Sequence, residues 1–235
     1  MVDLRTVVLY ALIPVAATAL SGGIAAVRMP RPRVTSALQH VAAGVVFAAA
    51  AIELLPELLK HSPVPMLLGF AIGIAAMFGL RWATDQAERR GAGEAAGLIA
   101  ATGADFLVDG LVLGAGFAAG GQTGLLLTIA IAIEYLFVGL SVAAELGAAA
   151  SRRLKIGVPT GLALLTIAGA LVGAGALGGA PRAVRATVLA VGAVAFMYLV
   201  TEELLVRAHE RGETAFGSVL FFVGFLLYLV IEEIV

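Results

Sequence analysis

The sequence predicts an all-α, polytopic membrane protein: a bundle of eight transmembrane helices. Of its 235 residues 61% are hydrophobic and only 13% are charged, with a mean hydropathy of +1.04. A soluble domain is typically about 45–50% apolar and about 25% charged. This composition excludes an ordinary soluble enzyme and a disordered protein. The net charge of −1 gives no reason to expect nucleic acid as a partner.

The apolar residues form long uninterrupted runs rather than the alternating pattern of a membrane β-barrel. A spanning helix needs about 20 apolar residues. The first run is a retained span rather than a signal peptide, because it is long and contains Pro14. We expect one transmembrane domain over 1–235 with spans at approximately 5–27, 36–59, 64–82, 95–118, 122–150, 157–178, 183–206 and 214–235.

Basic residues predict the orientation of the spans. The connections after the first, third, fifth and seventh spans and the span ends beside them carry eleven of the 15 Lys and Arg, and the opposite side carries four. The richer side should face the cytoplasm, so both termini should lie outside, as an even number of spans requires. The excess of Arg over Lys, with abundant Ala, Gly and Val, is typical of a prokaryotic chain in a cytoplasmic membrane.

Eight of the 16 acidic residues lie within the first seven spans, whereas no Lys or Arg lies near the middle of a span. A carboxylate at the bilayer centre costs roughly 2.5–3.5 kcal/mol. Structural ion pairs would need bases nearby, so we expect these acids to be either protonated or visited by a cation. They are Glu53, Glu57, Asp105, Asp109, Glu134, Glu145, Glu202 and Glu203.

The fourth and fifth spans carry the sharpest signal. Asp105 and Asp109 are four residues apart, so they share one helix face. Glu134 begins a similar segment in the next span, since Asp-Phe-Leu-Val-Asp-Gly-Leu is followed there by Glu-Tyr-Leu-Phe-Val-Gly-Leu. We expect these two helices to pack face to face, with Gly110 and Gly139 allowing their backbones to approach.

A second sequence similarity links the second and seventh spans. Glu53 and Glu57 flank Leu-Leu-Pro near one span end, and Glu202 and Glu203 precede Leu-Leu in the other. Paired acidic segments in two halves of a membrane protein are a pointer to a transport site. We therefore predict a 3+2+3 arrangement, in which spans 1–3 and 6–8 are inverted repeats around spans 4 and 5.

At these residues the chain resembles the zinc/iron-regulated transporter-like (ZIP) family over nearly its whole length. Gly44 and Glu53-Leu-Leu-Pro-Glu57 are similar to the family's Gly-rich helix that ends in His-Leu-Leu-Pro-Glu. Residues 105–110 fall where the family has His-Asn-x-Pro-Glu-Gly, and residues 134–139 where it has its related fifth-span motif. Residues 198–205 are similar to its Val-Val-Glu-Glu-Leu pattern.

The resemblance implies a transporter that moves divalent cations such as zinc, iron, manganese or cadmium between helices 2, 4, 5 and 7. It assigns metal-binding roles to Asp105, Asp109, Glu134 and Glu202. We expect Glu53 to be a fifth metal-binding residue, in the pathway. The resemblance also implies a homodimer in the lipid bilayer and no tightly bound cofactor, because the metal is the cargo.

The motifs also depart from the family. Phe106, Tyr135 and Val138 stand where a ligand Asn, an acid and a second Glu are expected, and Val108 and Phe137 replace both motif prolines. We therefore expect a reduced metal centre and two straighter helices. With no His left in it, the site favours harder cations, since carboxylates suit Mg, Mn or Ca better than zinc.

Three further residues have both a functional and a structural interpretation. Glu203 lies about 100° from Glu202 on an ideal helix and either supports the ligands or marks a helix end. Glu57 lies at the entrance of the pathway or caps a helix end. His40 is a pathway residue or a polar residue at the membrane interface without a specific role.

Other functions stay open. The Asp pair can be a protonated pair in a proton-coupled carrier, or the relic of a non-transporting sensor or partner subunit. We expect no enzyme, because Ser141 has no His in mid-span to activate it.

Overall fold

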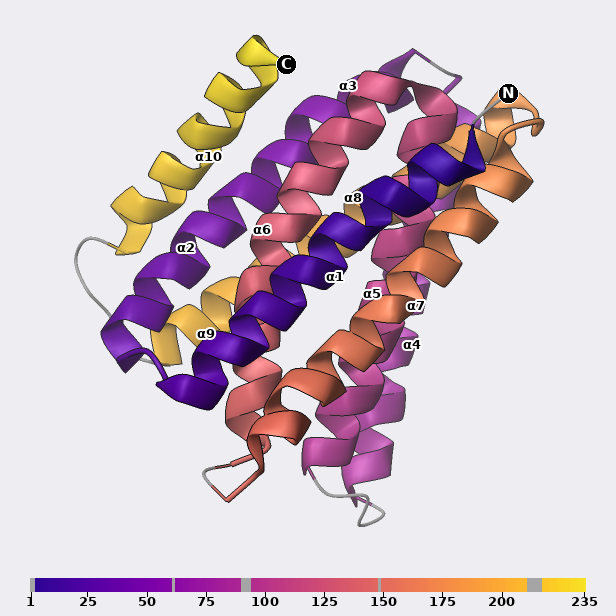
Figure 1. The fold of residues 1–235 in the computed structure, drawn as a ribbon. Coiled ribbons are helices and arrows are strands. Elements are labelled where there is room, and N and C mark those ends of the chain that lie inside the picture. The colour runs from indigo at the N-terminus through magenta and orange to yellow at the C-terminus, as the bar shows by residue number, and fades with distance from the viewer. Residues whose placement is uncertain (1–2, 61, 90–93, 148, 211–216) are drawn as a thin grey trace.

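The computed structural model describes residues 3–60, 62–89, 94–147, 149–210 and 217–235, and it confirms the all-α class with eight helices long and apolar enough to cross a membrane. The helical elements within these ranges follow one another along the chain (Figure 1). They are α1 (Leu4–Val27), α2 (Pro32–Ala49), η1 (Ala50–Leu54), α3 (Leu55–Leu59), α4 (Pro63–Arg89), α5 (Glu94–Ala119), α6 (Gly121–Glu145), α7 (Arg152–Leu177), α8 (Arg182–Tyr198), η2 (Leu199–Leu204), α9 (Leu205–Glu210) and α10 (Gly217–Ile234).

Two spans contain a π-helical segment. The second runs through α2, η1 and α3, and the seventh through α8, η2 and α9. Single π turns inside α-helices occur frequently at functional sites, because the extra residue shifts the register of the side chains that follow. Each π segment carries acids that the sequence singles out: Glu53 lies in η1, and Glu202 and Glu203 lie in η2.

Several helix boundaries differ from the predicted ones: the second span begins at Pro32 rather than 36, and the sixth at Arg152 rather than 157. The third span was expected to end near 82, but α4 continues to Arg89 through its polar last turns. The fifth was expected to reach 150, but α6 ends at Glu145 and Gly147 takes a φ of +81°. Glycine adopts this left-handed conformation without steric cost, so it stops the helix there.

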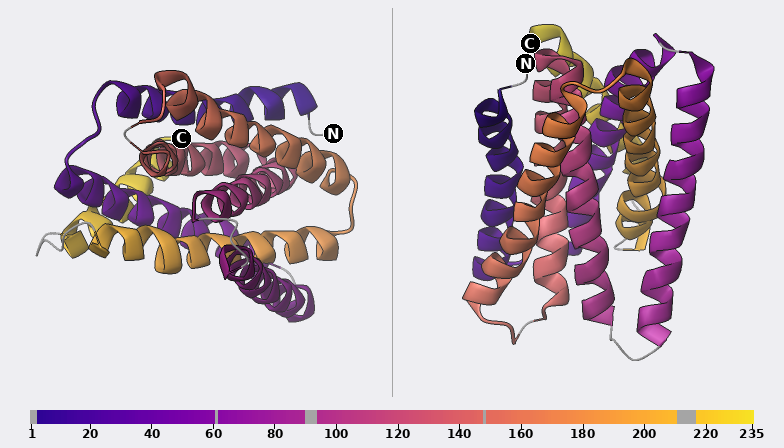
Figure 2. Two further views of the ribbon diagram at one scale, coloured as in Figure 1. Left: turned by 90° about the horizontal axis from the view of Figure 1, so that it is seen from below. Right: turned by 90° about the vertical axis from the view of Figure 1, so that its right-hand side faces the viewer.

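The two helices that carry Asp105, Asp109 and Glu134 lie inside the bundle. Figure 2 shows α5 and α6 between a layer of α1 and α7 and a layer of α2 and α8. The α6 span is the most buried of the eight. In contrast, α4 and α10 pack on the outside, α4 against α8 and α10 against α2. The interior position of α5 and α6 is what takes their acids out of water.

The helix contacts form corresponding sets. α1 packs against α6 and α7 against α5; α10 packs against α2 and α4 against α8; and α2 meets α6 as α8 meets α5. Each contact maps onto its counterpart when spans 1–3 exchange with spans 6–8 and span 4 with span 5. This packing is compatible with the predicted 3+2+3 arrangement of inverted repeats.

Glycines allow α5 to pack closely against α7, which is not the contact that the sequence predicts. A Cβ on Gly110 would collide with the backbone of α7 at Thr166, and one on Gly169 would collide with the backbone of α5. Gly139 instead faces Ser21 of α1. The prediction that Gly110 and Gly139 lie between α5 and α6 is therefore wrong, because each glycine turns to the outer neighbour of its helix.

Candidate metal centre

Three carboxylates from α5 and α6 meet inside the bundle. One oxygen from each of Asp105, Asp109 and Glu134 lies within 4.8 Å of the other two. The two aspartates lie on one face of α5 because they are one turn apart, and the packing of α6 against α5 brings Glu134 to that face. We call these three residues the carboxylate triad.

The triad is buried, and several of its carboxylate oxygens lack a hydrogen-bond partner. Glu134 is fully buried, Asp109 is 1% exposed, and Asp105 is partly buried. Neither oxygen of Glu134 has a hydrogen-bond partner, and neither has Oδ2 of Asp109. Within the part of the chain that the structure describes, no ion pair reaches any of the three. Buried polar atoms are normally satisfied, so these orphan oxygens require a proton or a cation.

The size of the triad fits one metal ion. Three oxygens no more than 4.8 Å apart enclose a point that is at most about 2.8 Å from each of them. Oxygen ligands lie about 2.3–2.6 Å from Ca²⁺ and about 2.0–2.2 Å from Zn²⁺, so a small contraction completes the contacts. The ligand set is entirely carboxylate, which suits a hard divalent cation.

Aromatic rings close the triad on one side. Phe106 and Tyr135 are fully buried, and their ring centroids are 4.0 Å apart. The Tyr135 hydroxyl forms a hydrogen bond of 2.6 Å with Oγ1 of Thr166 on α7, and it also lies near Asp109. Phe106, Tyr135 and the 7% exposed Val138 thus form hydrophobic core where the ZIP-like pattern has ligands. The motif prolines are missing as well, and α5 and α6 are each one unbroken α-helix.

The seventh span contributes Glu203 rather than Glu202 to the surroundings of the triad. Glu203 is partly buried, and its carboxylate interacts electrostatically with all three triad members. Glu202, which the sequence proposes as a ligand, has a side chain 45% exposed and is 2.8 Å from Nη1 of Arg81 on α4. Adjacent residues point about 100° apart on a helix, so only one of the two can face α5.

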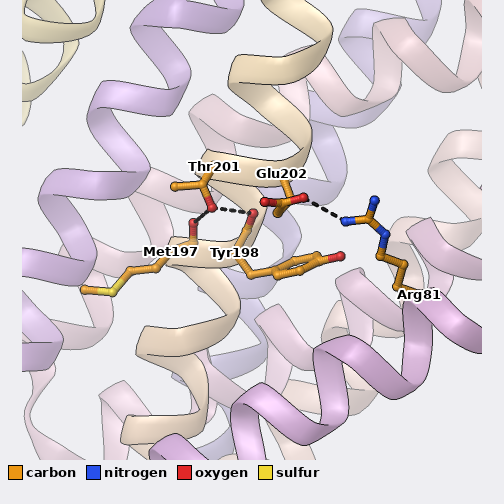
Figure 3. A network of polar contacts seen from close by, with 5 residues as sticks. All are labelled: Arg81, Met197, Tyr198, Thr201 and Glu202. Carbon is orange, nitrogen blue, oxygen red and sulfur yellow. Dashed lines mark hydrogen bonds and ion pairs between the residues drawn. The ribbon is translucent and has the colours of Figure 1, made fainter.

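Figure 3 shows how η2 holds Glu202 toward α4. Thr201 donates its hydroxyl to the carbonyl oxygen of Met197 at 2.9 Å and lies 3.4 Å from that of Tyr198. A threonine hydroxyl commonly bonds in this way to a carbonyl three or four residues earlier in a helix. The Tyr198 ring lies beside the pair formed by Glu202 and Arg81 (Figure 3).

A pocket of about 290 Å³ opens beside the triad between α4, α5 and the seventh span. Arg81 and Glu202 line it, as do Glu203 and Arg207, whose charged atoms are 3.3 Å apart. Arg207 also interacts electrostatically with Asp105. The pocket therefore has both signs of charge at its wall, and Glu203 both lines it and interacts electrostatically with the triad.

The remaining predicted site residues lie away from the triad. Glu53 is near Thr123 at the start of α6, and it interacts with Glu232 of α10 and with Lys60. Glu57 forms an ion pair of 2.7 Å with Lys60, and this hydrogen bond raises the pKa of the Lys60 ammonium group. His40 is 3% exposed and packs against His209 at the other end of the second span.

Sequence reasoning overlooked the bases. The expectation that no base accompanies these acids is wrong for Glu57, Glu202 and Glu203, which pair with Lys60, Arg81 and Arg207. Long side chains at span ends reach one or two turns inward, so a base outside the apolar run still meets an acid within it. Thr166 was overlooked too, because a lone Thr in an apolar span gives no signal.

Comparison of the chain with protein-family models gives no match, and comparison with curated protein sequences gives none either.

Proposed function

We propose that the protein transports divalent metal cations across the cytoplasmic membrane and that the carboxylate triad is its cation-binding site. The observation that carries the proposal is the burial of three carboxylates within 4.8 Å of one another, with three orphan oxygens and no base among the described residues close enough to pair. Eight apolar helices surround this site, as transport through a membrane requires.

The pathway follows from the same geometry. An ion leaving the triad meets Glu203 and then the pocket lined by Arg81, Glu202 and Arg207. We propose that this pocket faces the cytoplasm, because it lies at the Arg-rich end of the bundle, and that both termini face outward. The pocket is lined by Arg81 of α4 and Ala101 of α5. The end of α4 and the start of α5 lie at the opposite end of the bundle from the start of α1 and the end of α10 (Figures 1 and 2).

The cation that suits the site best is a hard one such as Mn²⁺. All three candidate ligands are carboxylates, and the triad contains no His or Cys, which are the ligands that favour zinc. Phe106 and Tyr135 fill the space of further ligands. This supports one metal ion rather than two in a divergent ZIP-like transporter, and we propose that it acts as a homodimer through the exposed apolar faces of its outer helices.

Transport by purified protein in liposomes tests the proposal. We expect Mn²⁺ uptake by the wild type, little uptake by Asp109→Asn, and wild-type uptake by Glu145→Gln. Glu145 is a matched control because it is an exposed acid on α6 that the triad does not include. Equal uptake by the wild type and Asp109→Asn would refute the assignment of the site.

A second candidate is a proton-coupled carrier in which the triad holds protons. Its support is the hydrogen bond between Tyr135 and Thr166, which places a transferable hydroxyl proton near Asp109. This version predicts acidification of the liposome lumen under an imposed potential without added metal, and loss of that signal in Asp109→Asn. A non-transporting sensor or partner subunit predicts metal binding without flux in either assay.

A further inference from the structure

Two histidines lie side by side away from the triad, His40 in the middle of α2 and His209 near the end of α9. The ring centroids of His40 and His209 are 5.2 Å apart with an angle of 63° between the rings. Both rings line a pocket of about 220 Å³ together with Ser218 and apolar side chains of α9 and α10. His40 is almost completely buried, whereas His209 is exposed.

Hydrogen bonds prepare both rings as metal ligands. Nδ1 of His40 is 2.9 Å from the carbonyl oxygen of Ser36, and Nδ1 of His209 bonds to that of Leu205. A carbonyl oxygen only accepts, so each Nδ1 carries a hydrogen and each neutral ring has its lone pair on Nε2. Metal-bound histidines are held in the same way, with the non-binding nitrogen donating to a carbonyl or carboxylate.

Gly217 lets α10 pack on the face of the His40 ring. A Cβ built on this first residue of α10 would lie 2.8 Å from Nε2, 2.9 Å from Cε1 and 3.3 Å from Cδ2 of the ring. These similar distances place the Cβ over the ring face rather than in the ring plane, where the Nε2 lone pair points. A side chain at this position would therefore press on the ring and displace His40.

The ring separation matches that of two imidazoles on one metal ion. With Zn–N bonds of about 2.0–2.1 Å and tetrahedral angles, two ring centres on one zinc stand about 5 Å apart. The observed separation is 5.2 Å. Edge-to-face ring packing alone gives centroid distances in the same range, so what points to a ligand is that both Nδ1 atoms are engaged in hydrogen bonds and both rings line one pocket.

We propose that His40 and His209 form a second metal site, which takes one borderline divalent cation such as Zn²⁺ through their Nε2 atoms. Imidazole suits zinc, whereas the carboxylate triad suits harder cations. Water and the Ser218 hydroxyl complete the coordination within the pocket. The ion ties α2 to α9, and so joins the second span to the seventh at the end where the pocket of Glu203 opens. The site does not depend on the triad being a transport site.

Zinc binding by the full-length protein in detergent tests the site, with Asp109→Asn as the background so that the triad does not contribute. We expect His209→Gln to weaken Zn²⁺ binding by roughly tenfold or more, because one of the two imidazole ligands is lost. Gly217→Ala should weaken it as well, through crowding at His40. His61→Gln is the control, since it removes the third histidine, and it should bind as the background does.

X-ray absorption at the zinc edge provides the second measurement. Two imidazole nitrogens at about 2.0–2.1 Å are expected in the background protein, and one in His209→Gln. Because His209 is exposed, this variant should elute as the same species in size-exclusion chromatography. Unchanged affinity in His209→Gln, or a zinc shell without imidazole, would overturn the proposal and leave only ring packing.

Discussion

Replacing Asp109 by Asn tests the triad most directly, because the change keeps the shape of the side chain and removes only its charge. Asp109 is 1% exposed and one of its oxygens has no partner. In the metal-bound protein it supplies one of three negative charges around the ion. In the metal-free protein the same charge lies within 4.8 Å of two others, so the substitution has opposite effects on the two states.

Both effects can be sized. Removing one partner of a buried charge pair costs about 3–5 kcal/mol, so metal affinity should fall by roughly two to three and a half orders of magnitude. Two unit charges 4.8 Å apart repel by about 3.5 kcal/mol at an effective dielectric constant of about 20, which sets the scale of what the metal-free variant gains for each neighbouring charge. The variant should therefore be at least as stable as the wild type without metal.

Thermal unfolding in detergent measures both states. At a metal concentration of 100 Kd the wild type gains about 2.7 kcal/mol in the free energy of unfolding, and a variant with a 100-fold higher Kd gains about 0.4 kcal/mol. For a chain of this size these gains correspond to shifts in Tm of about 5–11 °C and below about 2 °C. Glu145→Gln should shift as the wild type does. An equal metal-induced shift in Asp109→Asn would refute the role of the triad.

Three further outcomes follow from the structure. Gly169→Ala should lower the free energy of unfolding by roughly 1–3 kcal/mol, because its Cβ meets the carbonyl oxygen of Leu107. Gly175→Ala on the same helix has open space around the new Cβ and should cost nothing. Chemical denaturation distinguishes the two variants. Tyr135→Phe should cost about 1–3 kcal/mol in the same assay, because it leaves the buried Thr166 hydroxyl without its partner, and wild-type stability would contradict the importance of that bond. Mn²⁺ affinity measured by calorimetry should fall as the pH is lowered, because protons compete with the metal for the triad carboxylates; a flat pH profile would exclude carboxylate ligation.

The acids illustrate how far sequence reasoning reached. Spacing within one helix predicts that Asp105 and Asp109 share a face, and the structure has them there together with Glu134. It does not predict which of Glu202 and Glu203 turns toward α5, because that depends on the register of the chain through η2. A π turn adds one residue to a helical turn, and no composition rule reveals where it occurs.

The glycines make the same point about contacts between helices. That Gly110 and Gly139 allow a close approach is readable from the sequence, since small residues line helix contacts in membranes. Which helix approaches each of them cannot be read from the sequence, because a repeat of 3.6 residues defines a face of a helix but not the neighbouring helix that packs against it. The structure pairs Gly110 with α7 and Gly139 with α1.

By itself the sequence determined the class of this protein, its eight spans and the shortlist of acids, because hydrophobic length and helical period are local properties of the chain. Only the tertiary structure decided that Asp105, Asp109 and Glu134 converge, that Glu202 turns away to Arg81, and that His40 meets His209. These decisions depend on how helices rotate and pack against one another. That rotation is set by contacts between residues far apart in the chain, which no local pattern contains.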